Sequence, residues 1–340
     1  MNAVFTVPGS SLSLPEEKML SMDFPITWLS KWQGLVGRFI TLKINNRCPL
    51  RCRHCSLFES GEPPEHEFLL SEAQLRSQIE AIDPAVYAVV VFVGGEPSLS
   101  VNSLRLGIDL CCERKLKSAI VSAPVWASSL SNANRFLDQV HGLNLLHLSF
   151  DLYHLEFLKA SFYENALEAA AARGLPVAML VCYANERELD DVNEKLRALR
   201  HRFIVSYSQV LPLGSGAQLL GQRQPGSTIE TMADLLALPR SCRAGNTVMD
   251  KHGNVYGCCW AESVNSSPLA MSANGGGART AIQELEASLI FQSVRKHGMI
   301  NSRTEQQKQV MLEIAKGKYF VNECHLCLEA MAQGGSSVWR

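Results

Sequence analysis

The chain has 340 residues, which is enough for one large α/β domain and a smaller second one. Hydrophobic residues make up 46% of it, and 32 basic residues balance 33 acidic ones to a formal net charge of -1, which argues against a nucleic-acid-binding surface that tracks phosphates. The longest clearly apolar run, Ala85 to Val93, is too short to span a bilayer, and the N-terminus lacks an export signal, so we expect a cytoplasmic protein whose eleven cysteines stay reduced.

The first part of the chain, residues 1–37, mixes Pro, Ser and Gly with a few apolar anchors and predicts an extension that lies over the domain. A regular alternation of strands and helices begins after it. Its first helix carries a capping box, Ser71 with Gln74 three residues later, and an apolar run of the kind buried in parallel sheets follows. We expect strands at 38–45, 86–93, 116–122, 143–150, 176–183 and 203–210, and helices at 71–82, 101–115, 127–140, 155–173 and 186–200.

Six strands that alternate with helices favour a parallel sheet with right-handed crossovers. Six units are too few for a full eight-unit TIM barrel, so the predicted fold is α/β, with a partial (β/α)6 TIM-like barrel over residues 38–220. In such sheets the active-site residues lie at the C-terminal ends of the strands.

The sequence pattern changes after residue 216, and a small α+β domain is expected over residues 221–340. Its parts are a linker at 221–230, a β-hairpin at 246–258 that turns at Lys251 to Asn254, a flexible loop at 263–280, and helices at 281–296 and 303–316.

Three cysteines, Cys48, Cys52 and Cys55, follow the first predicted strand with the spacing Cx3Cx2C. Thiolates this close on one loop converge on one metal centre. Zinc would need a fourth ligand, for which His54 is available in principle. Three thiolates on a four-iron cluster instead leave one iron open, as a catalytic site requires.

This cysteine loop, placed after the first strand of a six-unit β/α domain, resembles the radical S-adenosylmethionine (SAM) superfamily. A second match, Gly94, Gly95, Glu96 and Pro97, ends the second predicted strand. In that superfamily this turn contacts the methionine amino group of SAM. Two glycines let a backbone approach a ligand and a carboxylate pairs with an ammonium, although the same residues alone are typical of a tight turn.

Weaker similarities to the superfamily follow along the chain. Ser149 and Asp151 resemble its Ser-x-Asp segment, which lies near the SAM ribose or carboxylate, but Asp151 could equally cap the next helix. His54 occupies the position whose backbone flanks the adenine, and we do not interpret it as a ligand. Residues 210–216 resemble the Pro-x-Gly turn that closes the sixth strand, and they could be purely structural.

The resemblance implies a mechanism. The open iron of a [4Fe-4S] cluster binds the amino and carboxylate groups of SAM, and one electron, delivered by a donor such as flavodoxin or ferredoxin, cleaves the sulfonium bond. The resulting 5'-deoxyadenosyl radical abstracts a hydrogen atom from the substrate. The cofactor carries this chemistry, and the protein supplies orientation and a dry cavity.

A second group of cysteines, Cys242, Cys258, Cys324 and Cys327, lies beyond the predicted barrel. Without other context the group would fit a zinc ribbon. Behind a radical SAM domain, the Cx10Gx4C…Cx2C arrangement resembles the SPASM/twitch C-terminal domain. No cysteine follows Cys327, and the resemblance therefore implies the shorter twitch form, with one auxiliary [4Fe-4S] cluster on these four thiols.

The remaining thiols leave the outcome of the reaction open. Cys259 is either a small core residue or a hydrogen-atom donor that would produce epimerisation. Without such a donor, the auxiliary cluster would accept a second electron in a two-electron dehydrogenation. Cys182 ends the fifth strand and is a weaker candidate for substrate contact, while Cys111 and Cys112 are expected to be buried in a helix.

The substrate is the least determined part of the prediction. Only about 37 residues precede the barrel, too few for a separate peptide-recognition domain, which favours a small polar, amino-sugar-like secondary metabolite. A maturase of ribosomally made peptides is the alternative. A non-enzymatic metal scaffold or sensor is a second alternative, but it has no need for the turn that starts at Gly94.

Overall fold

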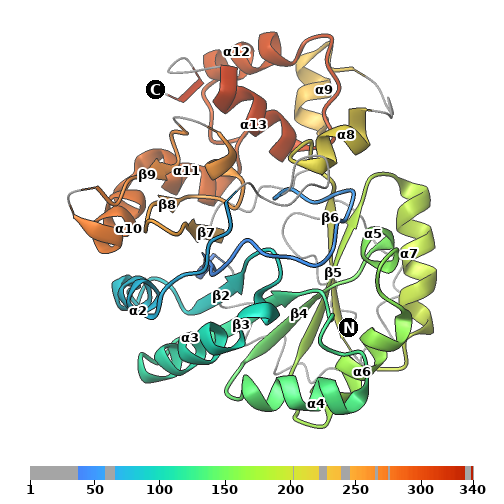
Figure 1. Cartoon of the computed structure of the whole chain (residues 1–340). Helices are drawn as coiled ribbons and strands as arrows, with labels where there is room; N and C mark the ends of the chain where they lie inside the picture. The colour runs from blue at the N-terminus through green and yellow to red at the C-terminus, as the bar shows by residue number, and fades with distance from the viewer. Residues whose placement is uncertain are drawn as a thin grey trace, which may run out of the picture.

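The computed structural model describes residues 37–57, 66–201, 203–221, 228–238, 246–264, 267–274, 276–333 and 338–339. These residues contain a nine-stranded sheet in the order β6-β5-β4-β3-β2-β1-β7-β8-β9 (Figure 1). All six predicted barrel strands are present and neighbouring ones pair in parallel, so the α/β prediction is confirmed. They are β1 (Phe39–Lys43), β2 (Val89–Val93), β3 (Lys117–Ser122), β4 (Leu145–Ser149), β5 (Val177–Tyr183) and β6 (Ile204–Gln209).

The helices between these strands also follow the predicted order, except that two helices, α5 and α6, take the place of the single one expected at 155–173. They are α2 (Glu72–Ala81), α3 (Val101–Glu113), α4 (Leu130–Gln139), α5 (Leu152–Leu155), α6 (Ala160–Ala171) and α7 (Glu186–Ala198). The capping box of α2 is confirmed, because Gln74 N donates to Ser71 Oγ at 3.2 Å and Ser71 N donates to Gln74 Oε1 at 3.0 Å. The prediction for Cys112 is wrong: Cys111 is buried in α3, but Cys112 is exposed.

Apolar residues cover both faces of the parallel strands. The face toward the helices carries Ile40 and Leu42 of β1 and belongs to the largest core cluster. The opposite, inner face has a smaller cluster built from Val89, Val91, Ala119, Leu145 and Ala178. Burial on both faces explains why these strands are continuous apolar runs and not alternating ones.

The predicted hairpin at 246–258 is confirmed as β7 (Asn246–Met249) and β8 (Val255–Tyr256), which pair antiparallel. Asp250 shapes its turn by accepting hydrogen bonds from the backbone of His252 and Asn254. The hairpin does not form a sheet of its own, because β7 pairs in parallel with β1 and continues the barrel sheet.

Two predictions for the C-terminal part are wrong in detail. The segment 263–280 is not only a loop, because it contains β9 (Ala270–Met271), which pairs with β8. The single helix expected at 281–296 is divided into α10 (Gly277–Ala287) and α11 (Leu289–His297), since Ser288 ends the first and caps the second. The remaining helices are α8 (Ser215–Gly221), α9 (Met232–Ala237), α12 (Glu305–Ala315) and α13 (Glu323–Gln333).

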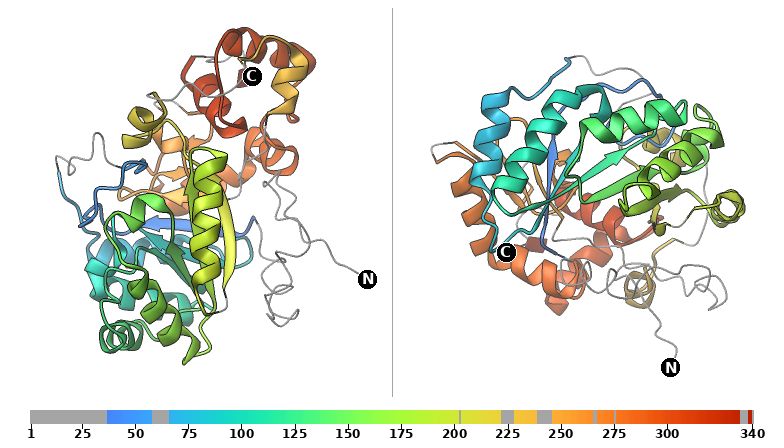
Figure 2. Two further views of the ribbon diagram at one scale, coloured as in Figure 1. Left: turned by 90° about the vertical axis from the view of Figure 1, so that its right-hand side faces the viewer. Right: turned by 90° about the horizontal axis from the view of Figure 1, so that it is seen from below.

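A second apolar cluster joins α9, α12 and α13 and includes Leu235, Met311, Leu326 and Cys327. Figures 1 and 2 show these helices grouped at one end of the barrel, beyond β6 and α8. None of the described helices is long and apolar enough to cross a membrane. The predicted N-terminal extension, apart from Gly37, and most of the 221–230 linker lie outside the described residues.

Candidate active site

The three-cysteine loop leaves the C-terminal end of β1, which lies between β2 and β7. Cys52 is buried, whereas Cys48 and Cys55 are half-buried. The loop is folded tightly, since Cys55 N donates to Cys52 O at 3.0 Å and Leu50 N donates to Cys48 Sγ at 3.4 Å. Burial raises the pKa of Cys48 to about 12, so its thiolate needs a positive centre beside it.

The arrangement of the three thiols bears on the choice between zinc and a cluster. A tetrahedral zinc site holds its sulfurs about 3.8 Å apart. Within the described part of the chain, Cys48, Cys52 and Cys55 are not all within 4.8 Å of one another, although Cys52, His54 and His154 are. The three sulfurs are thus not gathered as in a preformed zinc site, whereas the group of Cys52, His54 and His154 is close enough for a single ion.

Gly94 and Gly95 follow β2 and pack against the cysteine loop. A Cβ atom would lie 2.6 Å from Asn45 O at Gly94 and 2.4 Å from Arg47 O at Gly95. Gly95 N and the next backbone N–H donate to these same two carbonyls. Glycine is thus required at both positions by the approach of two backbone segments, a reason that the sequence did not reveal.

Glu96 is only 1% exposed, and its carboxylate meets three donors. Ser122 Oγ and Ser98 N donate to Oε1 at 2.6 and 2.9 Å, and Ala123 N donates to Oε2 at 2.8 Å. Burial raises its pKa, and these hydrogen bonds oppose the rise. Pro97 begins the short 3-10 helix that Glu96 caps. Sequence reasoning missed Ser122 and Ala123, and contact of the Gly94–Pro97 turn with SAM stays a prediction.

Asp151 lies two residues after the end of β4 and caps α5. The capping interpretation is therefore confirmed. Its Oδ1 accepts from His154 Nδ1 at 2.8 Å, and its Oδ2 lies 3.5 Å from His54 Nε2. Burial works against the charge of Asp151, but the two histidines hold its pKa below the usual range. Ser149, the last residue of β4, accepts a hydrogen bond from Tyr163 through its carbonyl.

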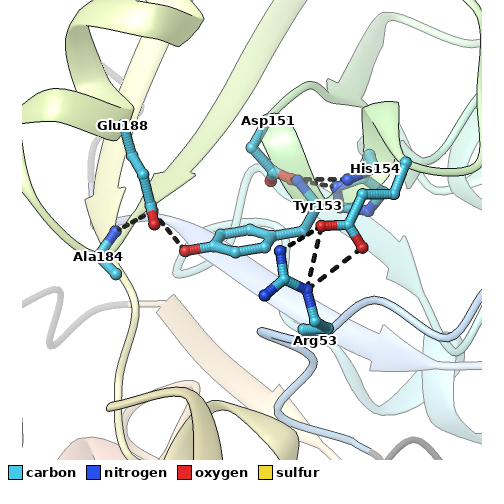
Figure 3. Close-up of polar contacts among 7 residues, drawn as sticks. Arg53, Asp151, Tyr153, His154, Ala184 and Glu188 are labelled. Atoms are coloured by element: carbon cyan, nitrogen blue, oxygen red, sulfur yellow. Dashed lines mark hydrogen bonds and ion pairs between the residues drawn. The ribbon is translucent and has the colours of Figure 1, made fainter. Parts of the chain in front are cut away.

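The side chain of His54 is held by stacking. Its ring lies 4.6 Å from that of Tyr153, centroid to centroid, and Arg53 lies over the same tyrosine ring. Figure 3 shows Tyr153 donating to Glu188, which also accepts from the backbone of Ala184. Burial lowers the pKa of His54 to about 4. These contacts tie the cysteine loop to α5 and α7.

His154 was not singled out from the sequence, although it follows the capping Asp151 by one helical turn. Burial disfavours its charge, but the Asp151 carboxylate outweighs burial and holds the pKa of His154 well above its usual range. Cys182 also faces this group, since its sulfur lies within 4.8 Å of a ring nitrogen of His54 and a carboxylate oxygen of Asp151. Its contact with substrate stays a prediction.

Cys258 and Cys259 begin a tight turn after β8. Ala261 N donates to Cys258 O and Ser263 N donates to Trp260 O, which is 3-10 geometry. Cys259 precedes this helix, and its thiol is an electrostatic neighbour of Lys43. Glu262 is ion-paired with Lys43. Burial lowers the pKa of Lys43 to about 8, and the neighbouring Cys259 and Asp250 partly oppose the shift.

The proposed auxiliary ligands are only partly brought together. Cys258 packs against the largest core, whereas Cys324 and Cys327 belong to the second cluster. Trp260, in the same turn as Cys258, also packs against that second cluster. Burial raises the pKa of Cys258 to about 12. Cys242 lies outside the described residues, and the four-thiol set stays a prediction.

Comparisons with known proteins agree with this geometry. The model of the Radical SAM superfamily matches residues 42–199, which include the three-cysteine loop and the turn from Gly94 to Pro97. The solved structure of tagged anSMEcpe with bound AdoMet shares the fold, with a TM-score of 0.52 at 15% identity, over 86% of this chain and 94% of that one.

Two curated proteins are distantly similar in sequence. "Putative peptide biosynthesis protein YydG" of Bacillus subtilis (strain 168) is 18% identical over 78% of this chain and 82% of its own length. GTP 3',8-cyclase of Listeria monocytogenes serovar 1/2a is 24% identical over 53% of this chain, which spans only 56% of that protein.

Proposed function

We propose that the protein is a radical SAM enzyme whose cluster is held by Cys48, Cys52 and Cys55. When bound, the cluster would supply the electron that splits SAM into methionine and a 5'-deoxyadenosyl radical. The protein supplies the binding frame. The turn from Gly94 to Pro97 is packed on the cysteine loop, so a group bound at one lies beside the other.

Buried atoms without partners support SAM binding at this place. Among the described residues, six buried side-chain N or O atoms lack a hydrogen-bond partner, and Asn45 Oδ1, His54 Nδ1 and Asp151 Oδ2 are three of them. All three border the cysteine loop. SAM carries an ammonium, ribose hydroxyls and an adenine amino group, which are donors of the kind that Asn45 Oδ1 lacks, while Asp151 Oδ2 has only the 3.5 Å ion-pair contact with His54 Nε2.

For the outcome of the reaction we infer that Cys259 returns a hydrogen atom to the substrate radical, which gives epimerisation, and that the resulting thiyl radical takes one electron from the external donor and one proton from solvent. The observation that carries this proposal is the ion pair of Glu262 with Lys43. Lys43 ends β1 and is in register with Val93, on the inner face of the barrel strands. Cys259 is an electrostatic neighbour of the same Lys43 ammonium, which supports a position of the thiol near the end of the strand that carries the cysteine loop.

A two-electron dehydrogenation is the second candidate. It needs the auxiliary cluster on Cys242, Cys258, Cys324 and Cys327 to accept an electron. The packing of Trp260 against the cluster of apolar residues around Cys327 supports an approach of these segments. An external donor such as flavodoxin or ferredoxin would restore the first cluster in either case.

The relative named for peptide biosynthesis aligns over most of both chains, and it supports a peptide as the substrate. A small polar, amino-sugar-like metabolite is the second candidate. A non-enzymatic scaffold would not bind SAM, so calorimetry with SAM separates it from both.

Anaerobically reconstituted protein, given SAM and dithionite, should release 5'-deoxyadenosine, and Cys52→Ala should release none. Wild-type protein that releases none would refute the proposed function. A panel of short peptides and amino sugars is then screened for compounds that speed up the release of 5'-deoxyadenosine, which identifies the substrate class. The screen is run in D2O, so that hydrogen transfer to the product can be followed. A thiol exchanges its hydrogen with solvent, so epimerisation adds one deuteron to the product, whereas dehydrogenation removes two hydrogens and adds none.

A further inference from the structure

We propose that the ion pair of Lys43 and Glu262 binds one residue of a peptide substrate through its backbone. The ammonium of Lys43 donates a hydrogen bond to the carbonyl oxygen of that residue, and the carboxylate of Glu262 accepts one from its N–H. The inference deepens the proposed function, on which it rests, because it selects a peptide over an amino sugar.

The inner face of the barrel strands changes from apolar to polar toward their C-terminal ends. The strand registers place four buried residues in the first part of this face: Val89, Ala119, Leu145 and Ala178. On the same face, the last parts of β1, β4, β5 and β6 carry polar residues that are half-buried or exposed: Lys43, Ser149, Cys182 and Ser208. A substrate at this end, where the cysteine loop leaves β1, therefore meets polar groups.

The ion pair is the charged part of this polar end. Lys43 is the last residue of β1, and Glu262 comes from the short 3-10 helix after β8. The two side chains are 17% and 21% exposed, so both charges are largely withdrawn from water but can still be reached. An ammonium has three N–H donors, and within the described part of the chain that of Lys43 pairs with Glu262 alone. Donors and carboxylate lone pairs therefore remain for a ligand.

The two opposite charges decide which group can bind beside them. A substrate carboxylate would be attracted by Lys43 but repelled by Glu262, and the ammonium of an amino sugar would meet the reverse. A neutral group that offers an acceptor and a donor on one side suits both charges. One residue of an extended peptide is such a group, because its C=O and N–H point toward the same neighbour, as in a hydrogen-bonded pair of antiparallel strands.

The position of the pair also suits the proposed reaction. The thiol of Cys259, the proposed hydrogen-atom donor, is an electrostatic neighbour of the same ammonium. A peptide residue held by Lys43 and Glu262 would thus have its Cα near that thiol and near the end of the strand that carries the cysteine loop. The pair would select the substrate and also orient the carbon that reacts.

The test measures how far each of three probes speeds up release of 5'-deoxyadenosine from the reconstituted full-length enzyme with SAM and dithionite. The probes are a pool of short N-acetylated peptides with a C-terminal amide, the same pool with a free C-terminal carboxylate, and glucosamine. We expect the amide pool to stimulate the wild type most. Lys43→Met should raise the concentration of this pool that gives half-maximal stimulation about tenfold, the effect of one lost hydrogen bond to a charged group. The control is Lys117→Met, at the exposed start of β3, which should keep the wild-type concentration.

Two further variants separate binding from packing. Glu262→Gln keeps the size of the side chain but leaves the ammonium without a counter-charge, so the preference should shift toward the carboxylate pool. The double variant Lys43→Glu with Glu262→Lys keeps an ion pair but exchanges donor and acceptor, and it should not restore stimulation by the amide pool. An ion pair with a purely structural role predicts the opposite in both cases.

Three results would overturn the inference: an unchanged half-maximal concentration in Lys43→Met, full recovery in the exchanged double variant, or a wild type that responds to glucosamine and to neither peptide pool. If Lys43→Met does not fold, Glu262→Gln decides, and an unchanged order of the two peptide pools would refute the proposal. Wild-type protein that releases 5'-deoxyadenosine but is stimulated by neither pool refutes this inference alone. Wild-type protein that releases none refutes the proposed function as well, so the two failures are distinguishable.

Discussion

The two groups of cysteines differ in how the chain brings them together. Cys48, Cys52 and Cys55 lie on one loop that is fixed by neighbouring strand ends: the turn after β2 packs on it, and Asp151 after β4 holds it through His54. Cys258, Cys324 and Cys327 come from two distant segments and are divided between two apolar cores. One site is built into the sheet, and the other depends on the packing of the C-terminal helices.

This difference indicates which site should tolerate change. A site fixed by backbone contacts at the end of β1 has little freedom to adjust, whereas thiols on separate packed elements can be lost without disturbing the barrel. The two groups of cysteines should therefore respond differently to the same chemical substitution.

The largest effect is expected from removing one thiol in each group. Cys52→Ala should abolish release of 5'-deoxyadenosine, because the first cluster loses one of three ligands. Cys327→Ala should keep that release but lower the iron content from about eight to about four atoms per chain. Iron analysis measures the iron content, and chromatography measures the release of 5'-deoxyadenosine. About four iron atoms and one zinc in the wild type would show that the second group holds zinc.

The next effect concerns Cys259, whose thiol is an electrostatic neighbour of Lys43 at the end of β1. Cys259→Ala should keep 5'-deoxyadenosine release with substrate, but the product should carry no deuteron from D2O, since the exchangeable donor is gone. Cys112→Ala, an exposed thiol on α3, is the matched control and should behave as the wild type. Unchanged deuterium incorporation in Cys259→Ala would remove this thiol from the chemistry and assign the hydrogen transfer to another exchangeable group, whereas a wild-type product without a deuteron would favour dehydrogenation.

A smaller effect is expected where the turn after β2 meets the cysteine loop. In Gly95→Ala the new Cβ would lie 2.4 Å from Arg47 O, a backbone atom that cannot move without the loop. We expect a loss of about 1–3 kcal/mol in the free energy of unfolding and a lower iron content of the first cluster. Gly221→Ala, whose Cβ meets no atom within 4 Å, is the control. Equal iron and stability in both variants would mean that the loop is not held by this turn.

The same contrast explains how much could be predicted from the sequence. The strands were predictable because burial on both faces makes continuous apolar runs, and the first cysteines because their spacing is local. The contacts of Glu96 with Ser122 and Ala123 were not, since they join neighbouring strand ends that no sequence period connects. His154 was missed for a similar reason: only the fold brings α5 against the loop that carries Cys52.

The division of one predicted helix at Ser288 also lay beyond the sequence pattern. The apolar period continues across 281–296, but Ser288 has an extended backbone and caps α11, while Phe291 and Val294 turn toward two different cores. Helical periodicity does not report a change of partner within a run. The C-terminal part is thus harder to predict because its elements pack on more than one neighbour.

The smallest effect tests whether the Cys259 turn lies against the barrel, through the pH dependence of stability. Burial lowers the pKa of Lys43 from 10.5 to about 8, so between these values the unfolded chain binds more protons than the folded one. Stability contributed by this group must then rise as the pH increases from about 8 to 10.5.

Lys43→Met removes the titrating group, so its free energy of unfolding should lack this rise. We expect the difference between variant and wild type to change by about 2 kcal/mol across the interval, less than the full pKa shift implies because Glu262 pairs with the ammonium. Urea unfolding at both ends of the interval measures it. The control is Lys117→Met, which replaces an exposed residue at the start of β3. Its free energy of unfolding should change with pH as that of the wild type does. If the free energy of unfolding of Lys43→Met changed with pH as that of the wild type does, this lysine would be exposed to water and would lie away from the turn that carries Cys259.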